Sequence, residues 1–156
     1  MKIRWKTLII GVIIPLLVGG TASLISKDAM KSFETLNQPP LSPPSWLFPV
    51  AWTILYILMG IASYRVFTAE ADMTERKNAL IFYGIQLFFN FAWTIVFFNF
   101  GLYLFAFIWL VVLWFLILVT MLKFYKIDKK AGFLLLPYLF WVSFAGYLNF
   151  GVFLLN

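Results

Sequence analysis

The chain contains neither cysteine nor histidine. Without thiols it can form no disulfide, thiolate nucleophile or iron–sulfur ligation, and without imidazole it lacks a histidine base and the usual zinc and axial haem ligands. Acidic residues are also scarce, with six Asp and Glu against twelve Lys and Arg. Any haem-like ligand would therefore have to be held mainly by its faces and its carboxylates.

Hydrophobic residues make up 63% of the 156 residues, and charged residues only 12%. Continuous apolar runs of about 20 residues, the length of a bilayer-spanning helix, occur near residues 7–25, 46–67, 79–98, 102–125 and 131–155. These runs lack the alternating pattern of a membrane barrel. The sequence therefore predicts an all-α integral membrane protein, a five-helix transmembrane bundle that forms a single domain over residues 1–156.

The first apolar run permits a second interpretation. "MKIRWK" followed by "TLIIGVIIPLLVGGTAS" also resembles a signal peptide with a small-residue cleavage region. Leu24 and Ile25 extend the run toward transmembrane length, which favours a retained first helix.

Basic residues are distributed unevenly around the runs. If the amino terminus and the second and fourth connections share one side, ten basic residues lie on that side, and only Lys27 and Lys31 lie on the other. The ten are Lys2, Arg4, Lys6, Arg65, Arg76, Lys77, Lys123, Lys126, Lys129 and Lys130. This bias predicts a cytoplasmic amino terminus in a cell membrane, and it indicates membrane orientation rather than nucleic-acid binding.

The longest connection covers residues 26–45. Met30, Phe33 and Leu36 fall on about one helical face, which predicts a short helix before the prolines of "NQPPLSPPSWLFPVAW" begin. Prolines fix their own φ and bias the preceding residue toward an extended conformation, so this connection should be stiff. Trp46, at its end, is placed to mark the membrane boundary.

Amides and aromatic side chains bring polarity into the spans, whereas all six acidic residues fall in the connections. Gln86, Asn90, Trp93 and Phe97 share one face of the third span, and an amide facing lipid would lose its hydrogen bonds, so this face should point into the bundle. The amides could serve as interhelical glue, which is the commoner case, or as ligand contacts.

Two further faces combine aromatic and small residues. The second span places Trp52 and Tyr56 one turn apart, and the fifth places Trp141, Ala145 and either Leu148 or Asn149 on one side. Tryptophans beside small residues inside the apolar layer are candidate pocket walls.

Pro137 lies inside the fifth span and removes a backbone donor. The sequence predicts a kink there.

With these residues in view, the chain resembles the TspO or translocator-protein family of tryptophan-rich sensory proteins, also known as peripheral benzodiazepine receptors. The resemblance rests on "SPPSWLFPVAWTILYILMGIASYRV", "QLFFNFAWTIVFF" and "LLPYLFWVSFAGYLNF", which occur in the family's order. It implies a compact five-helix bundle, often dimeric, that binds tetrapyrroles such as protoporphyrin IX in a pocket opening toward the first connection. No cofactor is required, since the tetrapyrrole is the ligand.

The resemblance also implies site residues. Trp52 and Trp141 correspond to the paired pocket tryptophans, Asn90 to the pocket amide and Ala145 to the small residue beside the ligand. The remaining candidate contacts are Tyr56, Gln86, Trp93 and Leu148 in the spans, with Pro43, Pro44 and Trp46 in the lid over residues 26–45. Leu41 and Ser42 stand where many members keep an aromatic residue and a threonine.

The resemblance leaves three functions open. The first is a membrane receptor or carrier for porphyrin-type ligands, with Lys27 or Lys31 at the mouth meeting a propionate. The second is a light- and oxygen-dependent enzyme that degrades porphyrin, in which Trp52 and Trp141 would be the catalytic redox partners. The third is a regulatory membrane subunit that acts through partner proteins.

Overall fold

The apolar runs form the long helices of the computed structural model, which describes residues 2–156. The long helices are α1 (Trp5–Ile25), α3 (Leu47–Phe67), α4 (Met73–Thr94), α5 (Tyr103–Ile127) and α7 (Leu136–Leu155). Counting α6 (Lys129–Leu134) with α7, the described residues contain five helices long and apolar enough to cross a membrane. The predicted all-α membrane bundle is thus confirmed.

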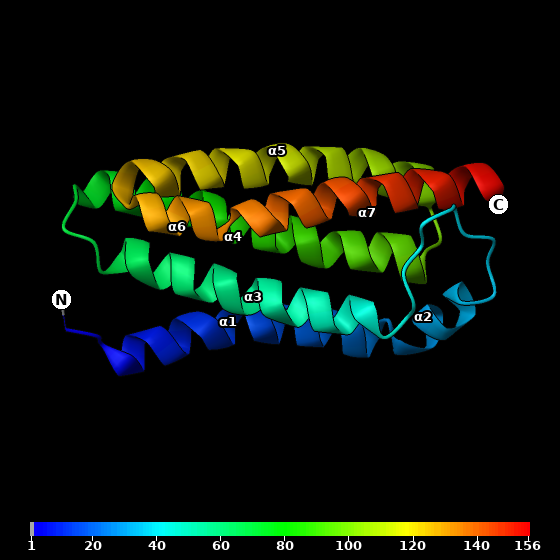
Figure 1. The fold of residues 1–156 in the computed structure, drawn as a ribbon, viewed down its shortest axis with the longest axis horizontal. Coiled ribbons are helices and arrows are strands. Elements are labelled where there is room, and N and C mark those ends of the chain that lie inside the picture. The colour runs from blue at the N-terminus through cyan, green and yellow to red at the C-terminus, as the bar shows by residue number, and fades with distance from the viewer. Residues whose placement is uncertain (1) are drawn as a thin grey trace.

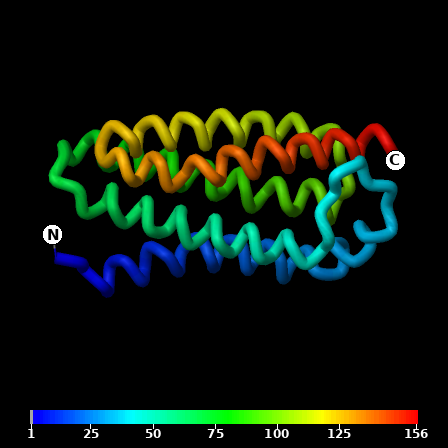
Figure 2. The backbone as a smooth tube through the Cα atoms, in the orientation of Figure 1, coloured from blue at the N-terminus to red at the C-terminus, as the bar shows by residue number. Residues whose placement is uncertain are grey.

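The helices lie side by side along the long axis of the molecule, and the two ends of the chain lie at opposite ends of the bundle (Figures 1 and 2). α1 packs on α3, α4 on α5, and α5 on both α6 and α7. The packing of α4 on α5 follows from the short connection after residue 99, and the packing of α5 on α6 and α7 from the one after residue 127, since short connections leave consecutive helices as antiparallel neighbours.

α1 and α3 approach closely because glycine faces glycine. A Cβ on Gly60 would lie 2.5 Å from Val12 Cα and 2.7 Å from the Gly11 carbonyl oxygen. Small residues at such a crossing let two backbones pack directly in a membrane, where no hydrophobic effect drives helices together.

A turn of π-helix, Ile95–Asn99, ends α4. The short helix predicted before the prolines is α2 (Lys27–Phe33), and it packs on this turn. The Phe33 ring lies 5.4 Å from the Phe97 ring and 5.3 Å from the Phe98 ring. Ser26 Oγ also donates to Asn99 Oδ1 at 2.5 Å, so the start of the first connection is fixed to the end of α4.

The fifth span is broken where the kink was predicted. α6 ends at Leu134, α7 begins at Leu136, and Pro137 lies in the first turn of α7, where its missing N–H removes no helical hydrogen bond. A Cβ on Gly132 would lie 2.6 Å from Tyr125 Cβ, so this glycine permits the close packing of α6 on α5.

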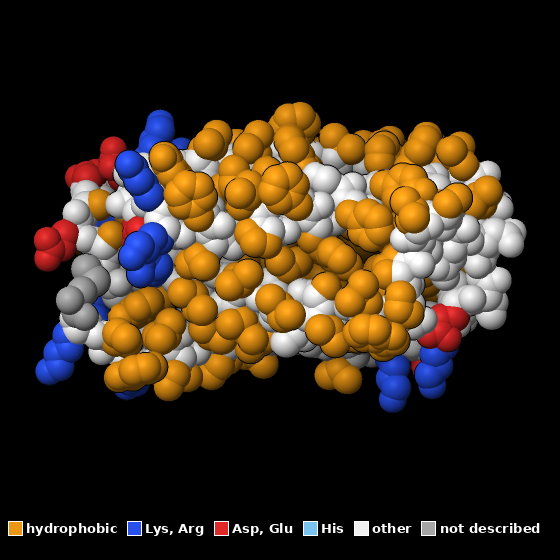
Figure 3. Space-filling model, viewed as in Figure 1, with side chains coloured by type: hydrophobic (Ala, Val, Ile, Leu, Met, Phe, Trp, Pro, Cys, Tyr) orange, Lys and Arg blue, Asp and Glu red, His pale blue; other side chains and the backbone are white. Residues whose placement is uncertain are grey.

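Apolar side chains cover the middle of the face shown in Figure 3, and charged side chains gather toward its ends. This pattern matches an apolar belt in the bilayer core. At the amino-terminal end, Arg65 Nε and Asp128 Oδ2 form an ion pair at 2.7 Å between α3 and the turn after α5.

Candidate ligand-binding site

Aromatic rings converge between α3 and α7. Trp52 stacks on Tyr56 with ring centroids 5.6 Å apart, and it meets Trp141 edge-on at 6.4 Å and Tyr138 at 6.2 Å. Phe48 contacts Trp141 at 6.1 Å. We call these five residues the aromatic box: Phe48, Trp52, Tyr56, Tyr138 and Trp141.

Helical spacing forms the box. Phe48, Trp52 and Tyr56 follow one another at four-residue intervals along α3, and Tyr138 and Trp141 are three residues apart on α7, so each set lies on one face of its helix. The box therefore consists of two facing aromatic stripes.

A buried chain of hydrogen bonds runs from the box to α4. Tyr56 Oη donates to Asn90 Oδ1 at 3.1 Å, Asn90 Nδ2 donates to Tyr138 Oη at 2.7 Å, and Tyr138 Oη donates to Gln86 Oε1 at 2.7 Å. Asn90 and Gln86 are both buried, as the shared-face pattern predicts. In this arrangement the hydrogen bonds of the two amides hold α3, α4 and α7 together, which is the structural role weighed above against ligand contact.

Some buried polar atoms have no hydrogen-bond partner within residues 2–156. Those in the bundle interior are Trp141 Nε1, Gln86 Nε2 and Tyr83 Oη. The first two are donors only, and an unpaired buried donor costs free energy. Trp141 Nε1 belongs to the box itself.

Gly19 of α1 packs against the Tyr56 ring of the box. A Cβ at this position would lie 2.2 Å from Tyr56 Cε2, well inside contact distance. Gly19 therefore leaves space for the Tyr56 ring that stacks on Trp52 and bonds to Asn90.

Trp93, another predicted contact, takes part in a different cluster. Its Nε1 donates to Asn149 Oδ1 at 3.0 Å, and its ring stacks on Phe97 at 5.2 Å. Asn149 Nδ2 in turn donates to the Tyr103 carbonyl at 2.8 Å. The structure thus gives Trp93 a packing role between α4, α5 and α7.

The remaining predicted contacts lie toward the carboxy-terminal end. Ala145 is buried one turn after Trp141, and Leu148 is half-buried. In the lid, Pro43 is half-buried and Pro44 is exposed, whereas 66% of the surface of Trp46 is exposed. Trp46 directly precedes α3, and its place at the membrane boundary stays a prediction.

The lid is docked on the end of α7. Tyr147 Oη donates to the Pro40 carbonyl at 2.7 Å, and Asn156 Nδ2 donates to the Asn37 carbonyl at 2.7 Å. A Cβ on Gly151 would lie 2.5 Å from Pro39 Cγ, so the absence of a side chain at Gly151 allows Pro39 to pack against α7.

Leu41 occupies an unusual place in this lid. Its φ is 69°, in the left-handed region that costs a non-glycine residue about 1–2 kcal/mol, and its side chain is 82% exposed. The Leu41 side chain therefore points away from the protein.

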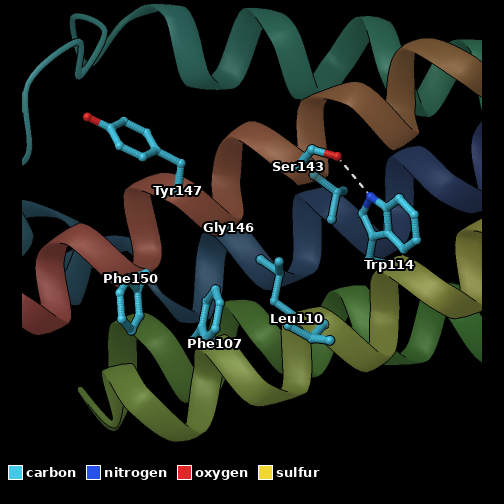
Figure 4. Close-up of a pocket in the computed structure, with 9 residues that line it drawn as sticks. Phe107, Leu110, Trp114, Ser143, Gly146, Tyr147 and Phe150 are labelled. Carbon is cyan, nitrogen blue, oxygen red and sulfur yellow. Dashed lines mark hydrogen bonds between the residues drawn. The ribbon is translucent and has the colours of Figure 1, made fainter.

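Two hollows are described, and the box residues line neither. One, of about 330 Å³, lies between α5 and α7 beside Phe107, Trp114 and Tyr147 (Figure 4). The other, of about 470 Å³, lies between α1 and α4 beside Leu17 and Gly84. The Trp52 ring centroid lies 5.6–6.4 Å from those of Tyr56, Tyr138 and Trp141, so a macrocycle placed between these rings would have to separate them.

Sequence reasoning missed two members of the box, Tyr138 and Phe48. Both could have been found from spacing, since Tyr138 precedes Trp141 by three residues and Phe48 precedes Trp52 by four. Phe48 lies within the proline-rich stretch, in the first turn of α3.

Comparison with known proteins places this architecture in a family. The chain is 42% identical over 130 residues to the tryptophan-rich protein TspO of Chlorobaculum tepidum, covering 83% of this chain and 82% of that protein. It is 40% identical over 136 residues to the tryptophan-rich sensory protein of Cereibacter sphaeroides, covering 87% and 82%. It is also 31% identical over 126 residues to the Homo sapiens translocator protein, covering 80% and 75%. Residues 11–155 match the TspO/MBR family, and the chain belongs to that family.

Proposed function

We propose that this protein is a membrane receptor or carrier that binds a porphyrin-type tetrapyrrole, such as protoporphyrin IX, between α3 and α7 under the proline-rich lid. The observation that carries the proposal is the aromatic box with the Trp141 N–H inside it, which has no acceptor within residues 2–156. Packed aromatic faces together with a free donor suit a flat, apolar macrocycle that bears acceptor groups. The tetrapyrrole is the ligand, and no further cofactor is required.

The charge distribution supports an anionic ligand with its propionates at the lid end. Lys27 and Lys31 are exposed on α2, which precedes the lid, whereas the box itself contains no charged side chain. A carboxylate would keep its hydration or pair with lysine there, while the macrocycle lies in the apolar interior.

Binding requires the box to open. The Trp52 indole lies against Tyr56, Tyr138 and Trp141, so a macrocycle between α3 and α7 must separate these rings. The hydrogen bonds that hold the lid to α7 are few and lie at its edge, so the lid can move without breaking the core.

The test is a titration of the purified protein with protoporphyrin IX in the dark, followed by the Soret absorbance of the ligand. We expect saturable binding that weakens at least tenfold in the double variant Trp52→Phe/Trp141→Phe. The matched control is Trp109→Phe/Trp114→Phe, which removes two indoles outside the box and should bind as the wild type does. Equal binding by both double variants would place the ligand elsewhere.

Illuminating the same complex in air tests the enzymatic alternative. Trp52 and Trp141 lie edge-to-face at 6.4 Å, so a pigment between them would contact two oxidisable indoles at once. Bleaching of bound porphyrin faster than free porphyrin, lost in Trp141→Phe, would add photodegradation to binding.

We also propose that the amino terminus faces the cytoplasm of a bacterial cell. The support is the excess of Lys and Arg at the amino-terminal end of the bundle, together with bacterial relatives at 40–42% identity. Accessibility of a cysteine introduced at Lys129, compared with one at Lys31, to an impermeant thiol reagent tests this orientation. Labelling at position 129 in intact cells would contradict it.

A homodimer completes the proposal. Gly20 and Gly84 have open space where a Cβ would stand, so a second copy could approach the backbone of α1 and α4 there. Light scattering of the detergent-solubilised protein, compared between wild type and Gly84→Leu, tests it.

A further inference from the structure

We propose that the bundle binds one ordered water between α3 and α4, on the amino-terminal side of the aromatic box. Tyr83 and Gln86 of α4 and Ser63 of α3 would hold it. The inference goes beyond the proposed function and does not depend on it, because none of these three side chains belongs to the box.

Two buried polar atoms on α4 have no hydrogen-bond partner within residues 2–156. They are Gln86 Nε2 and Tyr83 Oη, on side chains that are 1% and 7% exposed. The two residues are three apart on α4, so their side chains leave the helix on the same side, about one turn apart. Leaving such atoms unpaired costs free energy, and most buried polar groups are paired with protein or with ordered water.

The orientation of the Gln86 amide does not remove this deficit. Gln86 Oε1 accepts from Tyr138 Oη at 2.7 Å, while Asn90 Nδ2 donates to the same hydroxyl at 2.7 Å. Turning the amide over would place a second N–H group against Tyr138 Oη and leave the Tyr138 hydrogen without an acceptor. The Gln86 N–H group therefore needs an acceptor from elsewhere.

Ser63 supplies a third polar group, on the facing helix α3. Its side chain is 8% exposed, and its Oγ donates to the Gly60 carbonyl at 2.9 Å, which leaves the oxygen free to accept. Ser63 lies beside Tyr83, but the two hydroxyls form no direct hydrogen bond. A water between them can accept from Gln86 Nε2 and Tyr83 Oη and donate to Ser63 Oγ, which gives it the usual number of about three hydrogen bonds.

This water would join α3 and α4 a second time. Tyr56 Oη already bonds to Asn90 Oδ1, and Ser63 lies seven residues, or about two turns, further along α3. The interior hydrogen-bond chain would then run from Tyr56 through the amides of α4 and return to α3.

Size and charge select water as the occupant. The three side chains are neutral, and every acidic residue lies in a connection or near the start of a helix at an end of the bundle. The site thus offers no counter-ion to a cation, and burying an unpaired charge is costly. Neither described hollow is lined by these side chains, so the guest must be small, and a water needs little space and two to four polar partners.

A double-mutant cycle tests whether the two atoms of α4 share the water. We expect Tyr83→Phe to shift the folding equilibrium toward the unfolded state by about three- to tenfold, because a hydrogen-bonded hydroxyl is lost. In the Gln86→Met background, which keeps the side-chain length and removes the amide, the effect of Tyr83→Phe should fall to about twofold or less. Tyr125→Phe is the control, since that exposed side chain should behave alike in both backgrounds.

The sign of the effect decides between a hydrated and a dry site. Without a water the Tyr83 hydroxyl would be unpaired, and Tyr83→Phe would leave the unfolding midpoint unchanged or raise it. That result, or an equal loss in both backgrounds, would overturn the inference. Ser63→Ala is a second background in which the Tyr83→Phe effect should shrink, and it replaces Gln86→Met if that variant does not fold.

A crystal structure of the wild-type protein grown from lipid gives the position directly. We expect density for a water within about 3 Å of both Gln86 Nε2 and Tyr83 Oη. A well-ordered site without that density would contradict the proposal.

Discussion

Five of the seven tryptophans fall into two regions with different chemistry. Between α4, α5 and α7, Trp93, Trp109 and Trp114 each donate to an acceptor that the fold provides. Between α3 and α7, Trp52 and Trp141 are half-buried among rings, and the buried Trp141 Nε1 donates to nothing within the described residues.

The difference supports the proposed location of the ligand, because the fold completes the indole hydrogen bonds of the first region and not those of the second. A buried N–H without an acceptor costs stability, and most buried polar groups have a partner. Under the proposal, the first region packs the bundle, and a bound ligand completes the hydrogen bonding of the second.

The largest effect is expected from filling the space behind the box. Gly19→Ala places a methyl group 2.2 Å from Tyr56 Cε2, which must displace the ring, and we expect a loss of about 1–3 kcal/mol in the free energy of unfolding together with weaker porphyrin binding. Gly20→Ala is the matched control, because its Cβ meets nothing within 4 Å. Equal denaturant midpoints for the two variants in mixed micelles would show that Tyr56 does not depend on Gly19.

The hydrogen-bond chain that joins the two regions comes next. Tyr138→Phe removes the partner of both Asn90 Nδ2 and Gln86 Oε1, and we expect a loss of about 1–2 kcal/mol, given the modest worth of buried hydrogen bonds in membranes. Tyr125→Phe serves as the control, since that side chain is exposed. Equal unfolding midpoints for the two variants would argue against a structural role for the hydrogen-bond chain between Tyr56 and Gln86.

Substituting one tryptophan from each region separates stability from binding. Trp93→Phe leaves Asn149 Oδ1 without its donor and should lower the free energy of unfolding by about 1 kcal/mol with little change in porphyrin affinity. Trp141→Phe loses no hydrogen bond found within residues 2–156, so it should unfold closer to wild type and bind porphyrin more weakly. If the same unfolding and titration experiments showed that Trp93→Phe weakens porphyrin binding and Trp141→Phe lowers stability, the roles assigned to the two regions would be exchanged.

The smallest effect is expected at the lid. Tyr147→Phe removes the hydrogen bond to the Pro40 carbonyl at the protein surface, which should change the unfolding free energy by less than about 0.5 kcal/mol. It should accelerate porphyrin dissociation two- to fivefold, because the lid opens more easily. Stopped-flow displacement measures this rate, and an unchanged rate would mean that the ligand leaves by another route.

The sequence predicts much of this fold because its signals are local. Run length and hydropathy predict the spanning helices, Pro137 predicts the break in the last span, and the shared face of Gln86 and Asn90 predicts their burial. The carry-over by family resemblance selects Trp52 and Trp141, and helical spacing adds Tyr56; the structure brings the three together.

The pairing of side chains across helices could not be predicted in the same way. Periodicity puts Trp93 on the same inward face as Asn90, yet α4 turns Trp93 toward Asn149 on α7 and Asn90 toward Tyr56 on α3. Which indole lacks an acceptor depends on helix rotation and rotamers, since all tryptophans have the same donor. The left-handed conformation of Leu41 could not be predicted either, because leucine does not favour that conformation.

The most direct test of the account uses the indole N–H groups themselves. In a ¹H–¹⁵N spectrum of the protein labelled at the tryptophan indole, addition of protoporphyrin IX in the dark should move the Trp52 and Trp141 resonances strongly through the ring current of the macrocycle. The Trp109 and Trp114 resonances should move little. Trp114 lines the hollow between α5 and α7, so a large shift of its resonance with Trp52 and Trp141 unmoved would place the ligand in that hollow and contradict the account.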